Sequence, residues 1–388
     1  MDGKNIIEED KQYIAGTYAR FPVAFRDGKG CRLYDYDGKE YIDCGSGIAV
    51  NVFGVNDEKW KKAVIDQLNC IQHTSNLFYT EPQARLAKML CERTGAKKVF
   101  FGNSGAEANE CAIKAARKYG ETHYGPERKQ IITLKDSFHG RTLATLAATG
   151  QDNFHRYFGP FPEGFSYAEP TVEGVKKCMT ENTCAVMIEC IQGESGVNVL
   201  DGDFVRGLEK LCRERDILLI CDEVQTGNGR TGYLYSYMAY GIQPDIVTTA
   251  KGLGGGLPIG ACMLFEKCAD VFGYGDHGST FGGNPVVCAG ACSILERLDD
   301  KLLESVREKG AYFKEQLSKI KGVKSVTGAG LMIGIETDKP AAEIAAECIE
   351  RGLLVLTAHS KVRLLPALTI SKEEADFAVR ILNEVISR

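Results

Sequence analysis

Two ionisable side chains follow apolar runs of the kind that form buried strands. Asp222 comes directly after Leu218–Cys221, and Lys251 stands 29 residues later, between the run Ile246–Thr249 and the glycine-rich stretch Gly252–Gly256. That spacing is about one crossover connection, so we expect both side chains at the ligand-binding edge of a parallel sheet. A buried carboxylate requires a cation, and an uncrowded amine can react with a carbonyl group. Each residue alone would also be typical of a solvated loop.

A third feature is the segment Phe101–Glu110, where a strand is predicted to end and a helix to begin near Ser104. Ser104 and Glu107 have the spacing of a capping box. Glycines at positions 102 and 105 would let an anion approach the backbone N–H groups, and the helix dipole favours negative charge there. By itself the segment is equally compatible with an ordinary helix cap.

Together the three features provide a carboxylate, an amine and a phosphate cradle, the set that pyridoxal phosphate requires. A nucleotide-binding oxidoreductase is a weaker alternative, because Leu257 occupies the position at which a GxGxxG motif from Gly252 needs glycine. A catalytically silent binding protein is a further alternative, which the presence of both Asp222 and Lys251 disfavours. The amine–carboxylate pair therefore favours an enzyme.

The elements that would position these residues alternate between β-rich runs and helical stretches, which predicts an α/β fold with a mainly parallel sheet between helix layers. Past Gly283 the pattern changes to a smaller α+β unit, which begins with a long amphipathic stretch at 285–320. Asp37-Gly38 predicts a hairpin turn near the N-terminus. We predict an N-terminal segment (1–45) that joins the small domain, a large domain (46–284) and a small domain (285–388). The expected strands are 98–101, 130–134, 185–188, 217–221, 246–249, 261–265, 331–336, 353–356 and 363–365, and the expected late helices are 341–350 and 372–386.

Composition excludes several other classes of protein. The 388 residues carry a net charge of −5, with 44% hydrophobic and 26% charged residues, so neither a disordered scaffold nor a nucleic-acid-binding protein is expected. No apolar run approaches the roughly 20 residues of a membrane span. Met1–Lys11 is acidic and polar, unlike a secretory signal. Fifteen cysteines without a CxxC pair predict free thiols in a reducing cytoplasm, and the six scattered histidines predict no metal site.

Motifs along nearly the whole chain, in family order, resemble those of the class III (fold-type I) pyridoxal-phosphate-dependent aminotransferases, and most closely the branch that acts on N-acetylornithine. The resemblance implies a large domain with a seven-stranded, mainly parallel sheet and a smaller α+β domain. The stretches that carry it are Thr17–Pro22, Gly47–Asn51, His73–Tyr79, Phe100–Asn109, Phe138–Thr142, Glu189–Glu194, Asp222–Gly232, Lys251–Gly260, Ser279–Pro285 and Arg363–Pro366.

The resemblance also implies roles around the cofactor. Lys251 would hold pyridoxal phosphate covalently and move the reacting proton, so its pKa should lie below the usual value, and Asp222 would keep the pyridine nitrogen protonated. Thr280, beside Ser279, would reach the phosphate in the neighbouring subunit, which implies a homodimer with shared sites. The remaining cofactor contacts would be Gly105 and Ala106 at the phosphate, Phe138 stacked on the ring, Gln225 at the phenolic oxygen, and Glu189.

For the substrates, the resemblance implies that Arg141 binds an α-carboxylate and that Ser279 contributes to the same site. Glu194 and Arg363 would form a gating pair that opens when glutamate or 2-oxoglutarate binds. Gly47 stands where ornithine aminotransferases have a tyrosine, which leaves room for an N-acyl group. The implied reaction moves the terminal amino group of N-acetylornithine to 2-oxoglutarate. Alternatives are a transaminase for ornithine, succinylornithine or GABA, and an aminomutase acting on glutamate 1-semialdehyde.

Two stretches depart from the family pattern. Cys190 replaces the proline that usually follows the first glutamate of the Glu-x-x-Gln-Gly-Glu motif. The stretch Gly54–Asp57 lacks the usual Gly-His-x-His-Pro. We expect the first departure to loosen the backbone beside Glu189 and the second to alter the entrance to the site, while the cofactor-binding residues are unaffected.

Overall fold

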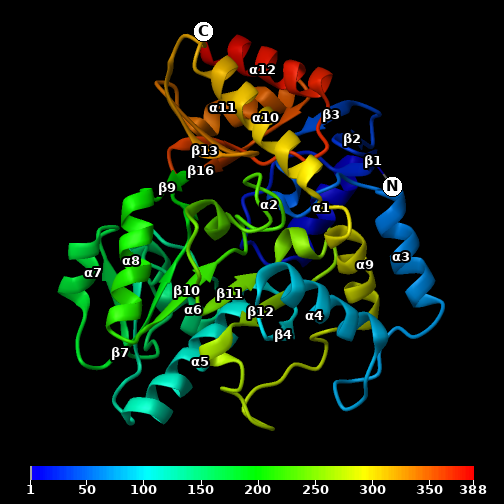
Figure 1. The fold of residues 1–388 in the computed structure, drawn as a ribbon. Coiled ribbons are helices and arrows are strands. Elements are labelled where there is room, and N and C mark those ends of the chain that lie inside the picture. Colours follow the sequence, from blue (N-terminus) through cyan, green and yellow to red (C-terminus); the bar gives the residue numbers. More distant parts are fainter. Residues whose placement is uncertain (1) are drawn as a thin grey trace.

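The computed structural model describes residues 2–388, and a twisted sheet lies at its centre (Figure 1). Between residues 98 and 264 the sheet has seven strands in the order β4-β12-β11-β10-β7-β5-β6, and only β12 runs antiparallel to its neighbours. This confirms the predicted α/β fold. The strands are β4 (Lys98–Gly102), β5 (Gln130–Leu134), β6 (Phe165–Ala168), β7 (Thr183–Ile188), β10 (Leu218–Asp222), β11 (Ile246–Thr249) and β12 (Gly260–Leu264).

Both faces of this sheet are covered. Consecutive strand residues point to opposite sides, and the residues on each side belong to a buried core. Ile220 and Ile246 belong to a core with α5, whereas Leu219 and Val247 belong to the larger core on the other side. Continuous apolar strands are therefore expected here. The helices of this part of the chain are α3 (Glu58–Leu68), α4 (Glu81–Thr94), α5 (Gly105–Tyr124), α6 (Leu143–Ala148), α7 (Val172–Cys178), α8 (Gly202–Glu214) and α9 (Pro285–Leu295).

A second unit lies beyond the large sheet, at the top of Figure 1, and contains a four-stranded sheet between residues 323 and 364. Its strand order is β13-β14-β17-β16, and α10, α11 and α12 accompany it. The elements are β13 (Val323–Ala329), β14 (Met332–Thr337), β16 (Leu356–Ala358), β17 (Lys361–Leu364), α10 (Asp300–Leu317), α11 (Ala341–Glu350) and α12 (Lys372–Ile386).

The N-terminal segment is joined to this second unit through a sheet of order β1-β2-β3-β15. Leu353 and Leu354 of β15 pair in parallel with Ile42 and Asp43 of β3. This pairing supports the prediction that residues 1–45 join the small domain, while the domain division at residue 284 stays a proposal. The elements are α1 (Gly3–Tyr13), β1 (Phe25–Lys29), β2 (Arg32–Asp35), β3 (Glu40–Asp43), α2 (Ser46–Ala49) and β15 (Leu353–Leu354), and a separate hairpin contains β8 (Ile191–Gln192) and β9 (Asn198–Val199).

The amphipathic stretch predicted at 285–320 is two helices rather than one. It is interrupted between α9 and α10, where Asp299 caps α10 by accepting a hydrogen bond from the Leu302 N–H at 2.8 Å. An Asp side chain in this position competes with helix continuation. The α9 half packs against α3 and α4, so it covers the large sheet. The predictions did not include α1 or β6.

The parallel strands bring five chain segments to one edge of the central sheet. Asp222 is the last residue of β10, and the segments that follow β4, β5, β7 and β11 contain Gly105, Phe138, Glu189 and Lys251 respectively. No helix within residues 2–388 has the length and apolar character that a membrane crossing requires.

Candidate functional site

A cavity of about 600 Å³ opens at the carboxyl edge of the sheet. It is lined by segments from all five strand ends and by Tyr18 of the N-terminal segment. Eight of the residues singled out from the sequence line this cavity: Gly105, Ala106, Phe138, Arg141, Glu189, Asp222, Gln225 and Lys251.

One end of the cavity is the N-terminus of α5. Ser104 caps the helix by accepting a hydrogen bond from the Glu107 N–H at 3.2 Å. Glu107 accepts from the N–H of Asn103, so the arrangement differs from the predicted capping box by one residue. A Cβ atom at Gly105 would lie 2.6 Å from Cγ1 of Val224. Glycine therefore permits a close approach at this point, where unpaired N–H groups of the first turn can bind an anion.

Asp222 forms the opposite, buried part of the site and is 4% exposed. Its Oδ2 accepts a hydrogen bond from Asn109 Nδ2 at 2.8 Å and lies 2.8 Å from His139 Nδ1. Its Oδ1 accepts from the Val224 N–H at 3.0 Å. Three fixed neighbours thus hold the Asp222 side chain at the end of β10, where it can pair with a cation inside the cavity.

Lys251 begins a short 3-10 helix immediately after β11 and has φ of +40°, in the left-handed region. A non-glycine residue in this conformation is strained, and such strain is concentrated at functional sites. Burial lowers the pKa of the Lys251 amine, while the negative charges of Glu194 and Asp222 partly oppose the shift. A larger fraction of neutral amine is therefore available to act as nucleophile or base.

Glu189 and Phe138 are connected across the cavity. Glu189 Oε2 accepts a hydrogen bond from the Phe138 N–H at 2.9 Å. Burial, with the charge of Asp222 adding to it, raises the pKa of Glu189 well above its usual value.

Arg141 lies over the ring of Phe154, 4.1 Å from the ring centre, and 5.5 Å from the ring centre of Phe138. These aromatic contacts hold an exposed guanidinium near the cavity, where it can bind a carboxylate.

Glu194 and Arg363 are in contact, as the family resemblance implied. Arg363 Nη1 donates to Glu194 Oε1 at 2.8 Å, and its side chain is 3% exposed compared with 28% for Glu194. Gln225 contacts both residues. Burial alone would raise the pKa of Glu194, but the attraction of Arg363 outweighs it and the pKa is lowered. The charged form of Glu194 is therefore favoured, and the pair lies next to the cavity through Gln225.

Besides Glu194 and Arg363, three residues singled out from the sequence lie outside the lining of this cavity. Thr280 is exposed and lies beside the segment 73–76. Ser279 accepts a hydrogen bond from Asn103, which does line the cavity, at 3.1 Å. Gly47 has φ of +63° within the irregular helix α2 and is exposed.

The two departures from the family pattern have local structural explanations. Asp57 caps α3 by accepting from the Trp60 N–H at 3.0 Å, and it forms an ion pair with Arg297 at 2.7 Å. Cys190 is 1% exposed, and its carbonyl accepts from the Leu200 N–H at 3.0 Å. The backbone beside Glu189 is therefore held by a hydrogen bond that a proline could also accept, and the expectation that Cys190 loosens this backbone stays a prediction.

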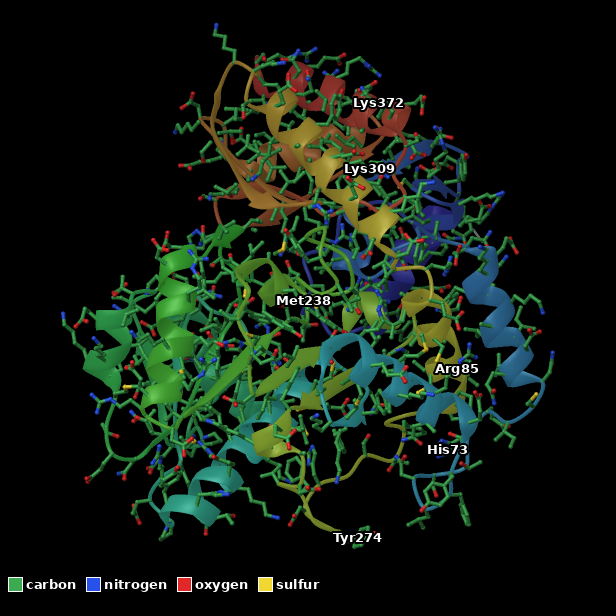
Figure 2. The ribbon with its side chains drawn as sticks, in the orientation of Figure 1. His73, Arg85, Met238, Tyr274, Lys309 and Lys372 are labelled. Atoms are coloured by element: carbon green, nitrogen blue, oxygen red, sulfur yellow. The ribbon has the colours of Figure 1, made fainter. Side chains whose placement is uncertain are left out.

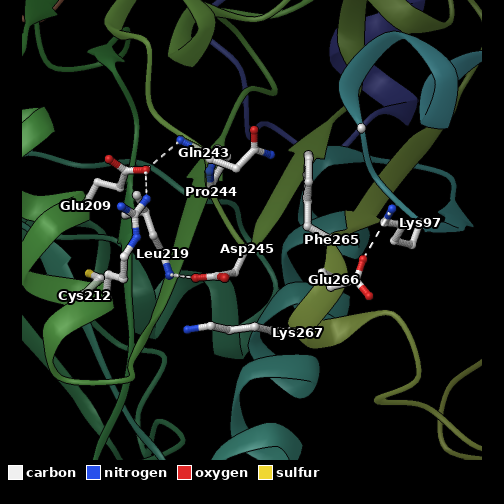
Figure 3. Close-up of a pocket in the computed structure, with 12 residues that line it drawn as sticks. Lys97, Glu209, Cys212, Leu219, Gln243, Pro244, Asp245, Phe265, Glu266 and Lys267 are labelled. Atoms are coloured by element: carbon white, nitrogen blue, oxygen red, sulfur yellow. Dashed lines mark hydrogen bonds and ion pairs between the residues drawn. The ribbon is translucent and has the colours of Figure 1, made fainter.

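A second cavity, of about 410 Å³, lies at the opposite edge of the sheet, where β10 begins and β12 ends (Figure 3). Its charged side chains neutralise one another: Arg213 pairs with Glu209 at 2.7 Å, and Lys97 pairs with Glu266 at 3.3 Å. Strand beginnings are not the usual ligand edge of such sheets. The cavity beside Lys251 is the better candidate site.

Sequence reasoning missed Asn109 and His139, which contact Asp222, Tyr18, which lines the cavity, and Phe154, whose ring contacts Arg141. Asn109 stands four residues after Gly105 on α5, so the helical period places both on one face. That spacing could have identified Asn109 once Gly105 was placed at the cavity. Tyr18 and Phe154 carried no comparable signal.

The donor set fits pyridoxal phosphate. Helix N–H groups at one end suit its phosphate, the buried Asp222 suits a protonated ring nitrogen, and the partly buried Lys251 suits its aldehyde. Phe138 lines the space between them.

Comparisons with known proteins agree with this fit. Residues 13–386 match the family described as Aminotransferase class-III. An acetylornithine aminotransferase from Haemophilus ducreyi is 49% identical over the full length of both chains. A structure of the ornithine aminotransferase from Toxoplasma gondii, with partial occupancy of pyridoxal phosphate at its active site, has a TM-score of 0.94 at 31% identity and covers 99% of this chain and 94% of its own. An acetylornithine aminotransferase from Elizabethkingia anophelis has a TM-score of 0.88 at 30% identity, with 100% and 99% covered.

Proposed function

The chain belongs to the class-III aminotransferases, and from that membership we propose that it transfers the terminal amino group of N-acetylornithine to 2-oxoglutarate. The products are N-acetylglutamate 5-semialdehyde and glutamate, and the reaction is a step of arginine biosynthesis. The observation that carries the substrate, N-acetylornithine rather than ornithine, is the 49% full-length identity to an acetylornithine aminotransferase. Fold similarity alone does not distinguish these two substrates.

Class-III aminotransferases use pyridoxal phosphate, which, when bound, supplies an electron sink for the pair left on the reacting carbon. We propose that Lys251 holds the cofactor covalently and that Gly105 and Ala106 donate backbone N–H groups to its phosphate. Asp222 keeps the ring nitrogen protonated. The contacts of Asp222 with Asn109 and His139, both at 2.8 Å, support this role because they fix the carboxylate. Phe138, Gln225 and Glu189 complete the cofactor contacts.

Lys251 has a second role, which is to move a proton. Its Nζ accepts the proton from the carbon that bears the amino group. The amine must be neutral to do so, and its lowered pKa supports this.

Three groups set the substrate preference in this proposal. Arg141 binds the α-carboxylate, with help from Ser279. The Glu194–Arg363 pair is closed when N-acetylornithine is bound, and Arg363 binds the side-chain carboxylate of glutamate or 2-oxoglutarate when the pair opens. Gly47 leaves room for the acetyl group.

We further propose a homodimer in which Thr280 completes the partner's phosphate site. Two neighbouring loops carry an unusual concentration of exposed apolar side chains. Asn76 of one loop donates to the carbonyl groups of Ser279 and Gly282 of the other at 3.0 and 2.7 Å. Tyr274 stands at the tip of the second loop, away from the body of the chain (Figure 2). A surface of this kind is typical of an interface. The exposed apolar residues are Leu77, Phe78, Tyr79, Tyr274 and Phe281.

The cysteines support a cytoplasmic location. All fifteen are free in the structure, and Cys70 is the exposed one. Buried free thiols are typical of a reducing compartment.

The test of the proposed function is a substrate panel. Purified holoenzyme is mixed with N-acetylornithine, ornithine, succinylornithine and GABA in turn, with 2-oxoglutarate as acceptor, and kcat/KM is measured for each. We expect the highest value for N-acetylornithine. A hundredfold preference for ornithine would refute this substrate while leaving the family intact. Failure of borohydride to attach the cofactor to residue 251 would refute the cofactor assignment.

A further inference from the structure

Gln225 touches both members of the Glu194–Arg363 pair and is itself 6% exposed. Its Nε2 donates to Glu194 Oε1 at 2.9 Å, and its Oε1 accepts from Arg363 Nη1 at 3.0 Å. The carboxylate of Glu194 and the guanidinium of Arg363 fix the orientation of the amide. In the reverse orientation the amide NH₂ would face the guanidinium N–H groups, and the amide oxygen would face the carboxylate oxygen. The three side chains form a closed triangle.

Close packing shows that this amide position is built into the site. A Cβ atom at Gly193 would lie 2.1 Å from Gln225 Oε1 and 2.7 Å from the methyl group of Met332. Only glycine at position 193 therefore lets the amide reach the pair. The Gly193 carbonyl also accepts from Arg363 Nη1, at 3.1 Å.

The hydrogen-bond count on Arg363 explains what the amide does. Nη1 has two hydrogen atoms and three acceptors, namely the Gly193 carbonyl, Gln225 Oε1 and Glu194 Oε1. If Glu194 leaves, two acceptors remain for two hydrogens. Gln225 can thus keep Arg363 in place, and its Nε2–H stabilises Glu194 only while the pair is closed.

We propose that Gln225 is a positioning residue for substrate alternation, which sets the balance between the closed and open states of the Glu194–Arg363 pair through its amide. The inference rests on the proposed transaminase function, because alternation matters only if two substrates share the site. It goes beyond a contact between Gln225 and the cofactor, which would affect both substrates alike. Because the amide is neutral, it can serve Arg363 without neutralising the guanidinium that a substrate carboxylate needs.

Two substitutions should shift the balance in opposite directions. Gln225→Glu keeps an acceptor for Arg363 but adds a fixed negative charge and removes the donor to Glu194. Arg363 is then neutralised permanently, so glutamate should bind poorly. Gln225→Met has a similar length and no hydrogen-bonding group. The closed pair then loses its support, so the amino donor should suffer more than glutamate.

The experiment measures each half-reaction separately in the holoenzyme, by the change of the cofactor absorbance on adding N-acetylornithine or glutamate. For Gln225→Glu we expect the ratio of kcat/KM for glutamate to that for N-acetylornithine to fall at least tenfold, with the loss mainly in KM, as is typical of a lost charge-assisted contact. For Gln225→Met we expect the ratio to rise. If the first variant does not fold, the second decides alone.

Equal losses in both half-reactions would overturn the inference, since they would indicate a cofactor contact only. A second readout is the double variant Glu194→Gln with Gln225→Glu, which restores the original net charge around Arg363. It should leave glutamate binding weak, because the carboxylate now occupies the more buried position, and recovery of glutamate binding would also overturn the inference. A wild-type protein that does not react with glutamate at all would instead refute the proposed function.

Discussion

Replacing Asp222 with asparagine tests the central electrostatic contact of the site. The carboxylate now accepts from Asn109 and lies against His139 through Oδ2, both at 2.8 Å, and accepts from the Val224 N–H through Oδ1 at 3.0 Å. An amide has one oxygen, so whichever way it is placed its NH₂ group must face at least one of these neighbours. The change therefore removes a negative charge and also places the new NH₂ group against a neighbouring N–H donor within a buried site.

The magnitude has two parts. Losing at least one charge-assisted hydrogen bond costs about 1.5–3 kcal/mol, so the free energy of unfolding should fall by ~2 kcal/mol while the fold persists. A carboxylate paired with a cation at a hydrogen-bonded separation of ~3 Å contributes roughly 5 kcal/mol at an effective dielectric constant of ~20, before desolvation offsets part of it. After desolvation, a loss of about 3–4 kcal/mol of transition-state stabilisation remains, which corresponds to a fall in kcat of roughly 10²–10³-fold.

The assay measures turnover with N-acetylornithine and 2-oxoglutarate, the dissociation constant of pyridoxal phosphate, and urea unfolding. Asp245→Asn is the matched control, because Asp245 also adjoins the central sheet and accepts the Leu219 N–H at 2.9 Å, but at the opposite edge. We expect the control to keep kcat within about twofold of wild type. A kcat near the wild-type value for Asp222→Asn would refute the role assigned to this carboxylate.

Three other predictions test further parts of the site. Burial lowers the pKa of Lys251 from 10.5 in the folded protein, so the unfolded chain binds more protons between the two pKa values and stability should rise with pH in that window. Urea unfolding of the cofactor-free wild type should show this rise, and cofactor-free Lys251→Met should lack it. An identical pH dependence of the two apoproteins would contradict the prediction. Arg141→Lys should raise KM for the amino donor about tenfold or more while kcat changes less, because lysine cannot make a bidentate carboxylate contact; an unchanged KM would count against Arg141. Thr280→Asp and Lys251→Ala proteins should each be inactive alone, but unfolding and refolding them together should restore activity, because the hybrid has one site with both native residues; absence of recovery would mean that Thr280 does not act across a dimer.

Local pattern was enough to predict much of the fold. Strands β5 and β11 and helices α11 and α12 were predicted at their observed bounds, because apolar runs and helical periodicity reflect burial on two faces or one. The break at Asp299 was not predicted, since an aspartate inside a helical pattern is also common on exposed faces. The small strand β6 lacked a distinguishing run.

The residue types and the strand-end positions of Asp222 and Lys251 follow from the sequence, because a polar residue after a buried apolar run must lie at a sheet edge. The contacts of Asn109 and His139 with Asp222, and of Gln225 with Glu194 and Arg363, depend on the tertiary structure. Gln225 and Arg363 are 138 residues apart; Gln225 follows β10 of the large sheet, and Arg363 lies in β17 of the second unit. Hydrogen bonds require atoms within about 3 Å, and periodicity along a chain says nothing about which distant segments meet at that distance. The packing of the two units against each other decides it.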